Sequence, residues 1–156
     1  MPKQKNYWLL KSEPRSYSIN DFARDKKTLW TGIRNYQARN FMRDDMNIGD
    51  EFLFYHSSTE QIGVVGAGKV IAKAASDETA LDKKNHSYDP KAKKDNNPWV
   101  APELQFVAKF PRVILLEELK KDPKLQGLMV IQRGSRLSVQ PVSKDHFLHI
   151  AQLSSS

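Results

Sequence analysis

Residues 29–43 read LWTGIRNYQARNFMR, and they gather aromatic rings, side-chain amides and guanidinium groups into one short stretch. From Arg34 onward the spacing predicts a helix, because the apolar residues that follow then share one face. Arg39 and Arg43 are four residues apart and fall together on the polar side of that helix. A core segment would hold fewer polar groups, and a plain surface helix would hold no Trp. The mixture indicates a surface that contacts something flat, polar and negatively charged.

The chain has 156 residues, a length that favours one domain over residues 1–156. It contains no cysteine, which excludes disulfides, thiolate metal sites and cysteine nucleophiles. No apolar run reaches the roughly 20 residues that a membrane-spanning helix needs, so we expect no membrane partner. The N-terminus has neither the apolar stretch of a secretory signal nor a long basic tail. We therefore expect a cytoplasmic bacterial protein that is monomeric and uses no cofactor.

The formal net charge of +7 is concentrated in the first part of the chain. Residues 1–43 hold ten basic and three acidic residues, a difference of seven, whereas residues 44–156 hold 15 of each. Such a localised excess attracts polyanions by electrostatic steering and counterion release. Charge alone leaves open an ordinary role in solubility, but it favours an anionic partner.

The remaining chain alternates short strands with short helices, which argues for an α+β fold. Apolar runs predict strands over residues 7–10, 51–55, 62–75, 103–110 and 136–142. Capping residues and amphipathic spacing predict short helices after Ser18, over 115–125 with a break at Pro123, and over 144–153. Residues 76–98 lack apolar periodicity and balance five lysines against five acids, so we expect a long charged loop. The expected form is a small curled sheet or barrel with helices outside it.

Two local patterns resemble active-site motifs but lack an essential member. GVVGAGKV at residues 63–70 contains G-x-x-x-x-G-K, yet Val70 stands where a phosphate-binding loop needs Ser or Thr for magnesium. A strand whose glycines permit a bulge or close packing explains these residues better. His146 and His149 have a spacing that suits a metal, but no strong third ligand accompanies them, so we expect no metal site. No serine lies in a G-x-S-x-G motif, and we predict no catalytic residue.

Trp30 and Trp99 stand beside polar or turn residues, and tryptophans at exposed edges suit base stacking. We expect the two to form one pocket. Asn35 offers a paired donor and acceptor that can read a base edge. His56 precedes Ser57 at a strand end, and it suits either a pocket mouth or an ordinary strand end. The guanidinium groups expected to hold phosphate are those of Arg39, Arg43 and Arg136.

Five segments occur together in a familiar order and approximate spacing: YWLLKSEP, WTGIRNYQARN, GDEFLFYHS, GVVGAGKV and RLSVQPV. From Tyr7 to Leu153 the chain thereby resembles the EVE domain family. The resemblance implies a PUA-like fold, a small twisted β-barrel with flanking helices, related to YTH and ASCH domains. It also implies a pocket for a modified nucleobase, with modified cytosine in DNA the leading proposal and RNA an alternative.

The resemblance also assigns residues to that pocket. Lys11 and Ser12 match the strand end that lines it, and Trp30 matches its cage aromatic. Trp99 is the expected second wall. The complete set of implied pocket residues is Lys11, Ser12, Trp30, Arg34, Asn35, His56, Ser57, Trp99 and Ser138.

The sequence thus favours a non-enzymatic reader that takes a modified base of DNA or RNA into an aromatic-lined pocket. Two alternatives remain open at this point. One is an enzyme acting on a modified nucleotide or nucleoside, with Glu13, Lys11 or His56 as the acid or base. The other is a protein–protein interaction module that uses the same basic face.

Overall fold

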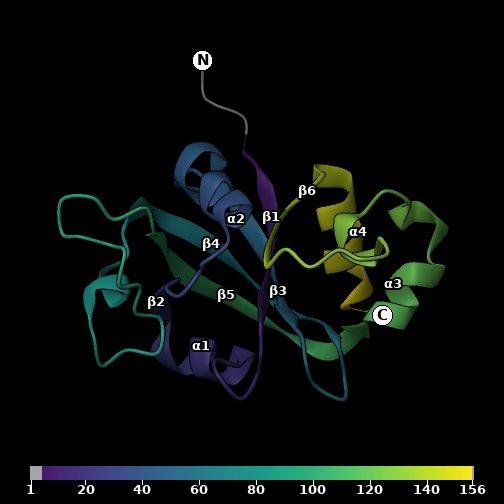
Figure 1. Cartoon of the computed structure of the whole chain (residues 1–156). Coiled ribbons are helices and arrows are strands. Elements are labelled where there is room, and N and C mark those ends of the chain that lie inside the picture. The colour runs from purple at the N-terminus through teal and green to yellow at the C-terminus, as the bar shows by residue number, and fades with distance from the viewer. Residues whose placement is uncertain (1–4, 156) are drawn as a thin grey trace.

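The computed structural model describes residues 5–155 and contains a six-stranded mixed sheet (Figure 1). Its order is β2-β5-β4-β3-β1-β6, in which β1 is parallel to β3 and the other neighbouring pairs are antiparallel. The strands are β1 (Tyr7–Ser12), β2 (Lys27–Leu29), β3 (Glu51–His56), β4 (Gly63–Ser76), β5 (Val100–Leu115) and β6 (Val139–Val142). The expected twisted sheet with outer helices is present, but it is open, because β2 and β6 form its two edges.

Short helices connect these strands. They are α1 (Ile19–Asp25), α2 (Tyr36–Asn40), α3 (Leu116–Lys121) and α4 (Lys144–Leu153). A π-helical turn, η1 (Phe41–Asp45), follows α2, and the 3-10 turns are η2 (Glu78–Leu81), η3 (Pro123–Leu125) and η4 (Met129–Ile131). Within residues 5–155 no helix is long and apolar enough to cross a membrane. The first four residues, with Lys3 of the basic segment, and Ser156 of the predicted domain lie outside the described residues.

The central strands are apolar along most of their length because both faces of the sheet are covered. Trp8 and Leu10 of β1 join a core that includes residues of α1 and α2. Leu9, between them, points the other way into a second core that includes residues of α3 and α4. The two helix pairs lie to the left and right of β1 in Figure 1. Continuous apolar runs are typical of strands buried on both faces.

The N-terminal caps form as predicted. The Ser18 side chain accepts a hydrogen bond from the backbone N–H of Asp21, and the Asp21 carboxylate accepts one from the N–H of Ser18. This reciprocal capping box starts α1. Ser143 caps α4 through the N–H of His146. The helix expected from Arg34 begins two residues later, because Asn35 is its N-cap.

The strand predicted over residues 103–110 ends too early, at the residue before Pro111, because β5 continues through this proline to Leu115. The register with β4 jumps here, so that Lys109 pairs with Gly66 while Ile114 pairs with Val64. Pro111 therefore lies in a bulge, where the missing N–H removes no ladder hydrogen bond.

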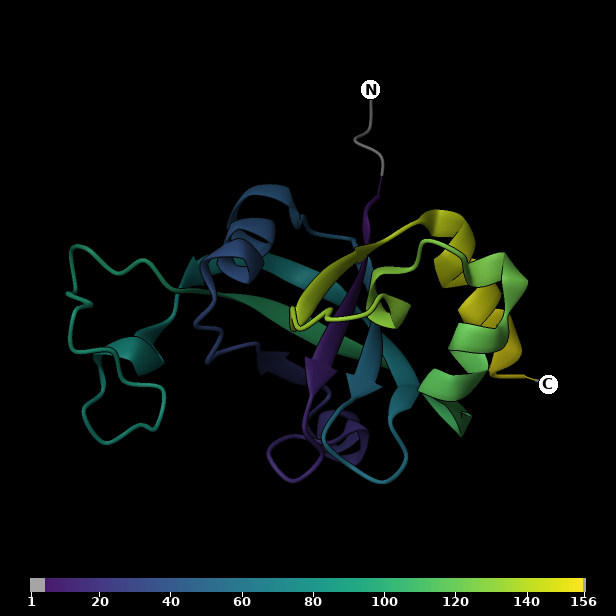
Figure 2. The same cartoon turned by 45° about the vertical axis from the view of Figure 1, so that its right-hand side comes forward.

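The long loop predicted for residues 76–98 is present, apart from η2 and an isolated bridge between Lys93 and Asn96. It projects beyond the sheet, on the left in Figure 2. A small cluster of its own buried residues holds it together: Ala80, Ala92 and Trp99. The loop is thus a folded excursion between β4 and β5.

The glycines of β4 permit close packing, as the sequence indicates. A Cβ atom added to Gly68 would overlap the ring of Phe52 and would lie 2.8 Å from the carbonyl oxygen of Gln105. Phe52 is fully buried, so its ring has little room to move away.

We expect Gly68→Ala to lower the free energy of unfolding by about 1–3 kcal/mol, because it overpacks the core. Urea denaturation would measure the change. Phe52→Leu removes part of the ring, so it should cost less in the Gly68→Ala background than alone. Strictly additive costs for the two substitutions would contradict a clash between these residues.

Candidate functional site

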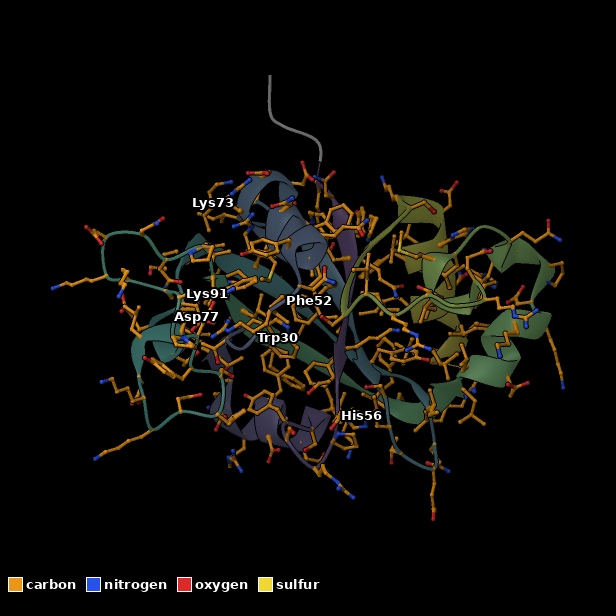
Figure 3. The ribbon with its side chains drawn as sticks, viewed as in Figure 1. Trp30, Phe52, His56, Lys73, Asp77 and Lys91 are labelled. Atoms are coloured by element: carbon orange, nitrogen blue, oxygen red, sulfur yellow. The ribbon has the colours of Figure 1, made fainter. Side chains whose placement is uncertain are left out.

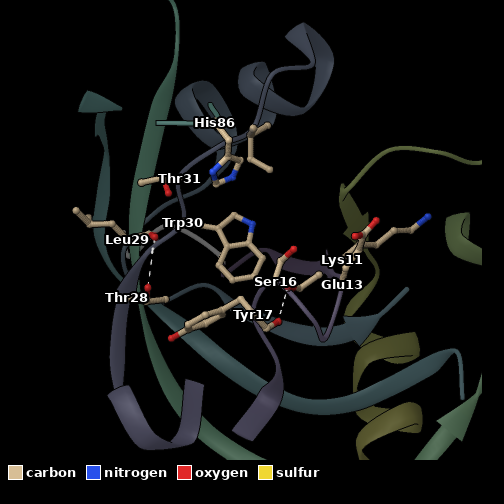
Figure 4. Close-up of a pocket in the computed structure, with 11 residues that line it drawn as sticks. Lys11, Glu13, Ser16, Tyr17, Thr28, Leu29, Trp30, Thr31 and His86 are labelled. Carbon is tan, nitrogen blue, oxygen red and sulfur yellow. Dashed lines mark hydrogen bonds between the residues drawn. The ribbon is translucent and has the colours of Figure 1, made fainter. Parts of the chain in front are cut away.

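A hollow of about 370 Å³ opens beside Trp30, between the end of β1, the segment that leads from β1 to α1, and β2 with the residues that follow it (Figure 4). Its lining combines aromatic rings with small hydroxyl side chains and few charged groups. The residues are Lys11, Ser12, Glu13, Ser16, Tyr17, Thr28, Leu29, Trp30, Thr31, Ile33 and His86. We call this hollow the Trp30 pocket. His86 reaches it from the long loop, far along the chain from the other members.

Trp30 belongs both to the core and to the pocket. Its backbone N–H donates to the carbonyl oxygen of Pro102 at 2.9 Å, which fixes it against β5. Its ring packs edge-on against Phe54 and Tyr17, with centroid distances of 5.7 and 6.2 Å. Only 7% of the residue is exposed. Trp30 belongs to the same core cluster as Phe52, and in Figure 3 it lies in the interior between α1 and α2. The pocket therefore offers part of an indole that the core holds rigidly.

Tyr17 supplies the second aromatic surface of the pocket. Its hydroxyl donates to Asp25 at 2.9 Å, and burial is the largest of the causes that raise its pKa to about 12. The phenol therefore stays neutral at physiological pH. Ser12 Oγ donates to the backbone carbonyl of Tyr17 at 2.5 Å, which ties the end of β1 to the segment before α1. Tyr17 is thus held in place by one hydrogen bond at its hydroxyl and another at its backbone carbonyl.

Lys11 contributes its aliphatic stem to the pocket rather than its charge. In Figure 4 its ammonium points away from Trp30. The ammonium donates to the carbonyl oxygen of Ser135 at 3.4 Å and lies 5.7 Å from the ring centroid of Tyr55. Burial lowers the pKa of Lys11. A half-buried cation with such weak partners can accept an anion.

Arg34 was expected in the pocket, but it anchors the long loop. Its guanidinium donates to Asp77 at 2.9 Å, to Thr79 Oγ1 at 3.1 Å and twice to the carbonyl oxygen of Ser87, at 2.8 and 3.0 Å. Burial acts to raise the pKa of Asp77, but hydrogen bonds from Thr79, Gly32 and Arg34 hold it below its ordinary value. Ser87 adjoins His86, so this cluster places His86 at the pocket.

Asn35 and Trp99 lie outside the lining of the Trp30 pocket. The carbonyl oxygen of the Asn35 side chain accepts the N–H of Ala38 at 3.0 Å, so it is occupied in capping α2. Trp99 is only 4% exposed, and its indole N–H donates to Asp89 at 2.7 Å. Its ring packs on Tyr36 at a centroid distance of 4.8 Å. The expected slot between two tryptophans is therefore not formed, because Trp99 serves the core of the loop.

His56, Ser57 and Ser138 support the neighbourhood of the pocket from outside it. The His56 ring nitrogen accepts the N–H of Ile19 at 3.1 Å at the start of α1, and burial lowers the pKa of His56. The N–H of Ser57 donates to the carbonyl of Ser12, and the N–H of Lys11 donates to the carbonyl of Ser138. These contacts hold the end of β1, which bears the pocket residues.

The guanidinium groups predicted to hold phosphate are scattered. Arg39 donates to the carbonyl oxygen of Pro98 at 2.9 Å and lies 4.9 Å over the ring of Tyr36. Arg43 forms an exposed ion pair with Asp44 at 2.7 Å. Arg136 is exposed on the segment before β6. None of the three lines the Trp30 pocket.

Tyr17 is a wall that sequence reasoning missed although a signal existed. It directly precedes the N-cap Ser18, where an apolar residue commonly packs on the fourth helical position. That position is Phe22, and the two rings lie 6.3 Å apart. No comparable signal marks His86, because its place depends on contacts of the long loop with Arg34.

Comparison with known proteins identifies the family of this chain. The model of the EVE domain matches residues 6–153. Mouse thymocyte nuclear protein 1 is 43% identical over 166 aligned residues, which cover 95% of this chain and 73% of the mouse protein. The crystal structure of human THYN1 in complex with DNA containing 5-methylcytosine superposes with a TM-score of 0.89 at 36% identity, covering 97% of this chain and 99% of the human one.

A more distant likeness concerns the fold alone. The YTH domain of Zygosaccharomyces rouxii MRB1, solved in complex with N6-methyladenosine RNA, has a TM-score of 0.60 at 12% identity, covering 99% of this chain and 89% of that one. The α+β, PUA-like fold expected from the resemblance is confirmed. The family match extends over nearly all of the chain. This chain therefore belongs to the EVE domain family.

Proposed function

We propose that this protein is a non-enzymatic nucleic-acid-binding domain that reads a modified base, with 5-methylcytosine as the first candidate. The observation that carries the proposal is the Trp30 pocket, in a chain that shares its fold with human THYN1. THYN1 has been crystallised with DNA that contains 5-methylcytosine. The relative supplies the ligand class, and the pocket supplies a place for it.

The pocket suits a single flat heterocycle. Its volume of about 370 Å³ lies at the small end of the range of roughly 300–1,000 Å³ for ligand pockets. Trp30 and Tyr17 present aromatic surface, while the hydroxyl groups of Ser16, Thr28 and Thr31 can meet the polar edge of a base. A methyl group on the base would gain apolar contact with the indole.

The energetics favour a base that leaves its helical stack at modest cost. Flipping a base out of a duplex costs a few kcal/mol and least for a strand that is already single. Stacking on an aromatic side chain returns about 1–3 kcal/mol per base. Because the core already fixes Trp30, little ordering of the wall is needed on binding.

The enzymatic alternative lacks a site where its acid and base candidates meet. Lys11 and Glu13 line the Trp30 pocket, but the Lys11 ammonium points away from it. His56 lines a different hollow and accepts the backbone N–H of Ile19. General acid–base catalysis needs these groups within hydrogen-bond reach of one reacting atom.

Trp30→Phe and His86→Ala should each weaken binding of a short single-stranded DNA that contains one 5-methylcytosine. The Phe variant shrinks the stacking surface but keeps an aromatic core residue, and we expect a loss of about two- to tenfold, which is part of a stacking contribution of about 1–3 kcal/mol. Fluorescence anisotropy with methylated and unmethylated DNA of one sequence would measure both affinities.

His146→Ala, on α4, is the matched control for His86→Ala and should change neither affinity. Thermal unfolding checks that each variant folds. A Trp30→Phe variant that keeps its full preference for the methylated strand would remove Trp30 from base recognition.

Arg34→Lys separates anchoring of the loop from contact with phosphate. Lysine keeps the charge but cannot reproduce the several directed hydrogen bonds of the guanidinium. We expect the loop to be cut faster by trypsin at its five lysines, Lys83, Lys84, Lys91, Lys93 and Lys94. Because lysine keeps the charge, the salt dependence of DNA binding should stay the same, and unchanged cleavage would contradict the anchoring role of Arg34.

A further inference from the structure

A second hollow of about 390 Å³ lies next to the Trp30 pocket, and Lys11 lines both. Its other lining comes from the end of β3, from α3, from η4 and from the segment between η4 and β6. The residues are Lys11, Tyr55, Leu116, Lys120, Val130, Ile131, Gln132, Arg133, Gly134 and Ser135. Three of them are cationic and none is a carboxylate. We call it the basic hollow.

The cations of the basic hollow have weak partners. The Lys11 ammonium has the long contact with Ser135 described above. Lys120 reaches Glu117 at 3.5 Å, in an exposed ion pair of a kind that contributes little. Arg133 is exposed and makes no ion pair or side-chain hydrogen bond with any of residues 5–155. These charges are therefore available to an anion.

The segment that carries Arg133 is fixed in place. Gln140 of β6 is 1% exposed, and its amide donates to Ser135 Oγ at 3.0 Å and to the carbonyl oxygen of Leu137 at 2.8 Å. Gly134 turns the chain sharply beside Arg133 with a φ of +77°. Tyr55 forms the floor, and burial raises its pKa to about 12, so its hydroxyl stays protonated. A neutral phenol can donate to an anion as well as accept.

We propose that the basic hollow binds a backbone phosphate next to the base held in the Trp30 pocket, with Lys11, Lys120 and Arg133 as the cationic contacts. This inference rests on the proposed function and specifies how the strand is seated. Lys11 joins the two sites, because its stem lines the base pocket while its ammonium faces the basic hollow. The strand then crosses the end of β1, away from Arg39 and Arg43.

The test compares two double variants with equal loss of charge. Lys120→Gln with Arg133→Gln removes two cations of the basic hollow. Arg43→Gln with Lys73→Gln is the control. Tyr55 of the basic hollow pairs with Val64 of β4, and Lys73 lies nine residues further along that strand, roughly 30 Å away at about 3.3 Å per residue. All four side chains are at the surface, so we expect both variants to fold.

The measurement is the affinity for short single-stranded DNA, with and without one 5-methylcytosine, over a series of salt concentrations. Each phosphate that the protein no longer neutralises reduces the magnitude of the slope of log affinity against log salt by about 0.7 for a single strand, so the loss of this one phosphate site should reduce it by about 0.7. Its affinities for the methylated and the unmethylated DNA should fall by the same factor, because phosphate contacts do not depend on the identity of the base. The control variant should keep the slope of the unaltered protein.

The outcomes separate the two proposals. If the slope of the first variant is unchanged while the unaltered protein prefers methylated DNA, the phosphate site is wrong and the reader function stands. If the unaltered protein binds both DNAs equally, base reading fails, and the slopes on unmethylated DNA still decide the phosphate site. Failure to bind either DNA would overturn both.

Discussion

The ion pair between Arg34 and Asp77 determines where the long loop lies. Asp77 is a buried carboxylate, and a buried charge is stable only when a partner and hydrogen bonds compensate it. Arg34, Thr79 and the backbone of Gly32 provide that compensation. The same guanidinium also donates to the carbonyl of Ser87, which adjoins His86. The ion pair that compensates the buried charge of Asp77 therefore also places His86 at the pocket. The excursion between β4 and β5 is thereby part of the site.

The pocket and the core share side chains, which explains how so small a domain presents a rigid site. Trp30 packs on Phe54 and Tyr17 while part of its surface remains open to the hollow. Lys11 likewise lines two hollows, because its side chain is long enough to reach from one to the other. Residues with an apolar body and a polar tip suit such double roles. The consequence is that the site needs few residues devoted to it alone.

Local signals in the sequence predicted much of the fold. The capping box at Ser18 and the cap at Ser143 were readable because each depends on neighbours a few residues away. The predicted end of a strand at residue 110 was wrong, because β5 continues through Pro111. Whether a proline ends a strand here depends on the register with β4, and no local sequence pattern contains that register. Trp99 was expected in the pocket but lies in the core of the loop, because its partners Asp89 and Tyr36 meet it only after the loop folds. The resemblance located Trp30, Lys11 and Ser12 in the lining, whereas His86 required the tertiary structure.

The open sheet leaves two strand edges that could pair with other chains and nucleate aggregates. Both edges carry features that oppose this. β2 is three residues long and begins with Lys27, and β6 is four residues long and contains Pro141, which has no N–H to offer a neighbouring strand. A domain that leaves its sheet unclosed can thus remain dispersed at high concentration, since neither border is long or regular enough to template growth by strand addition.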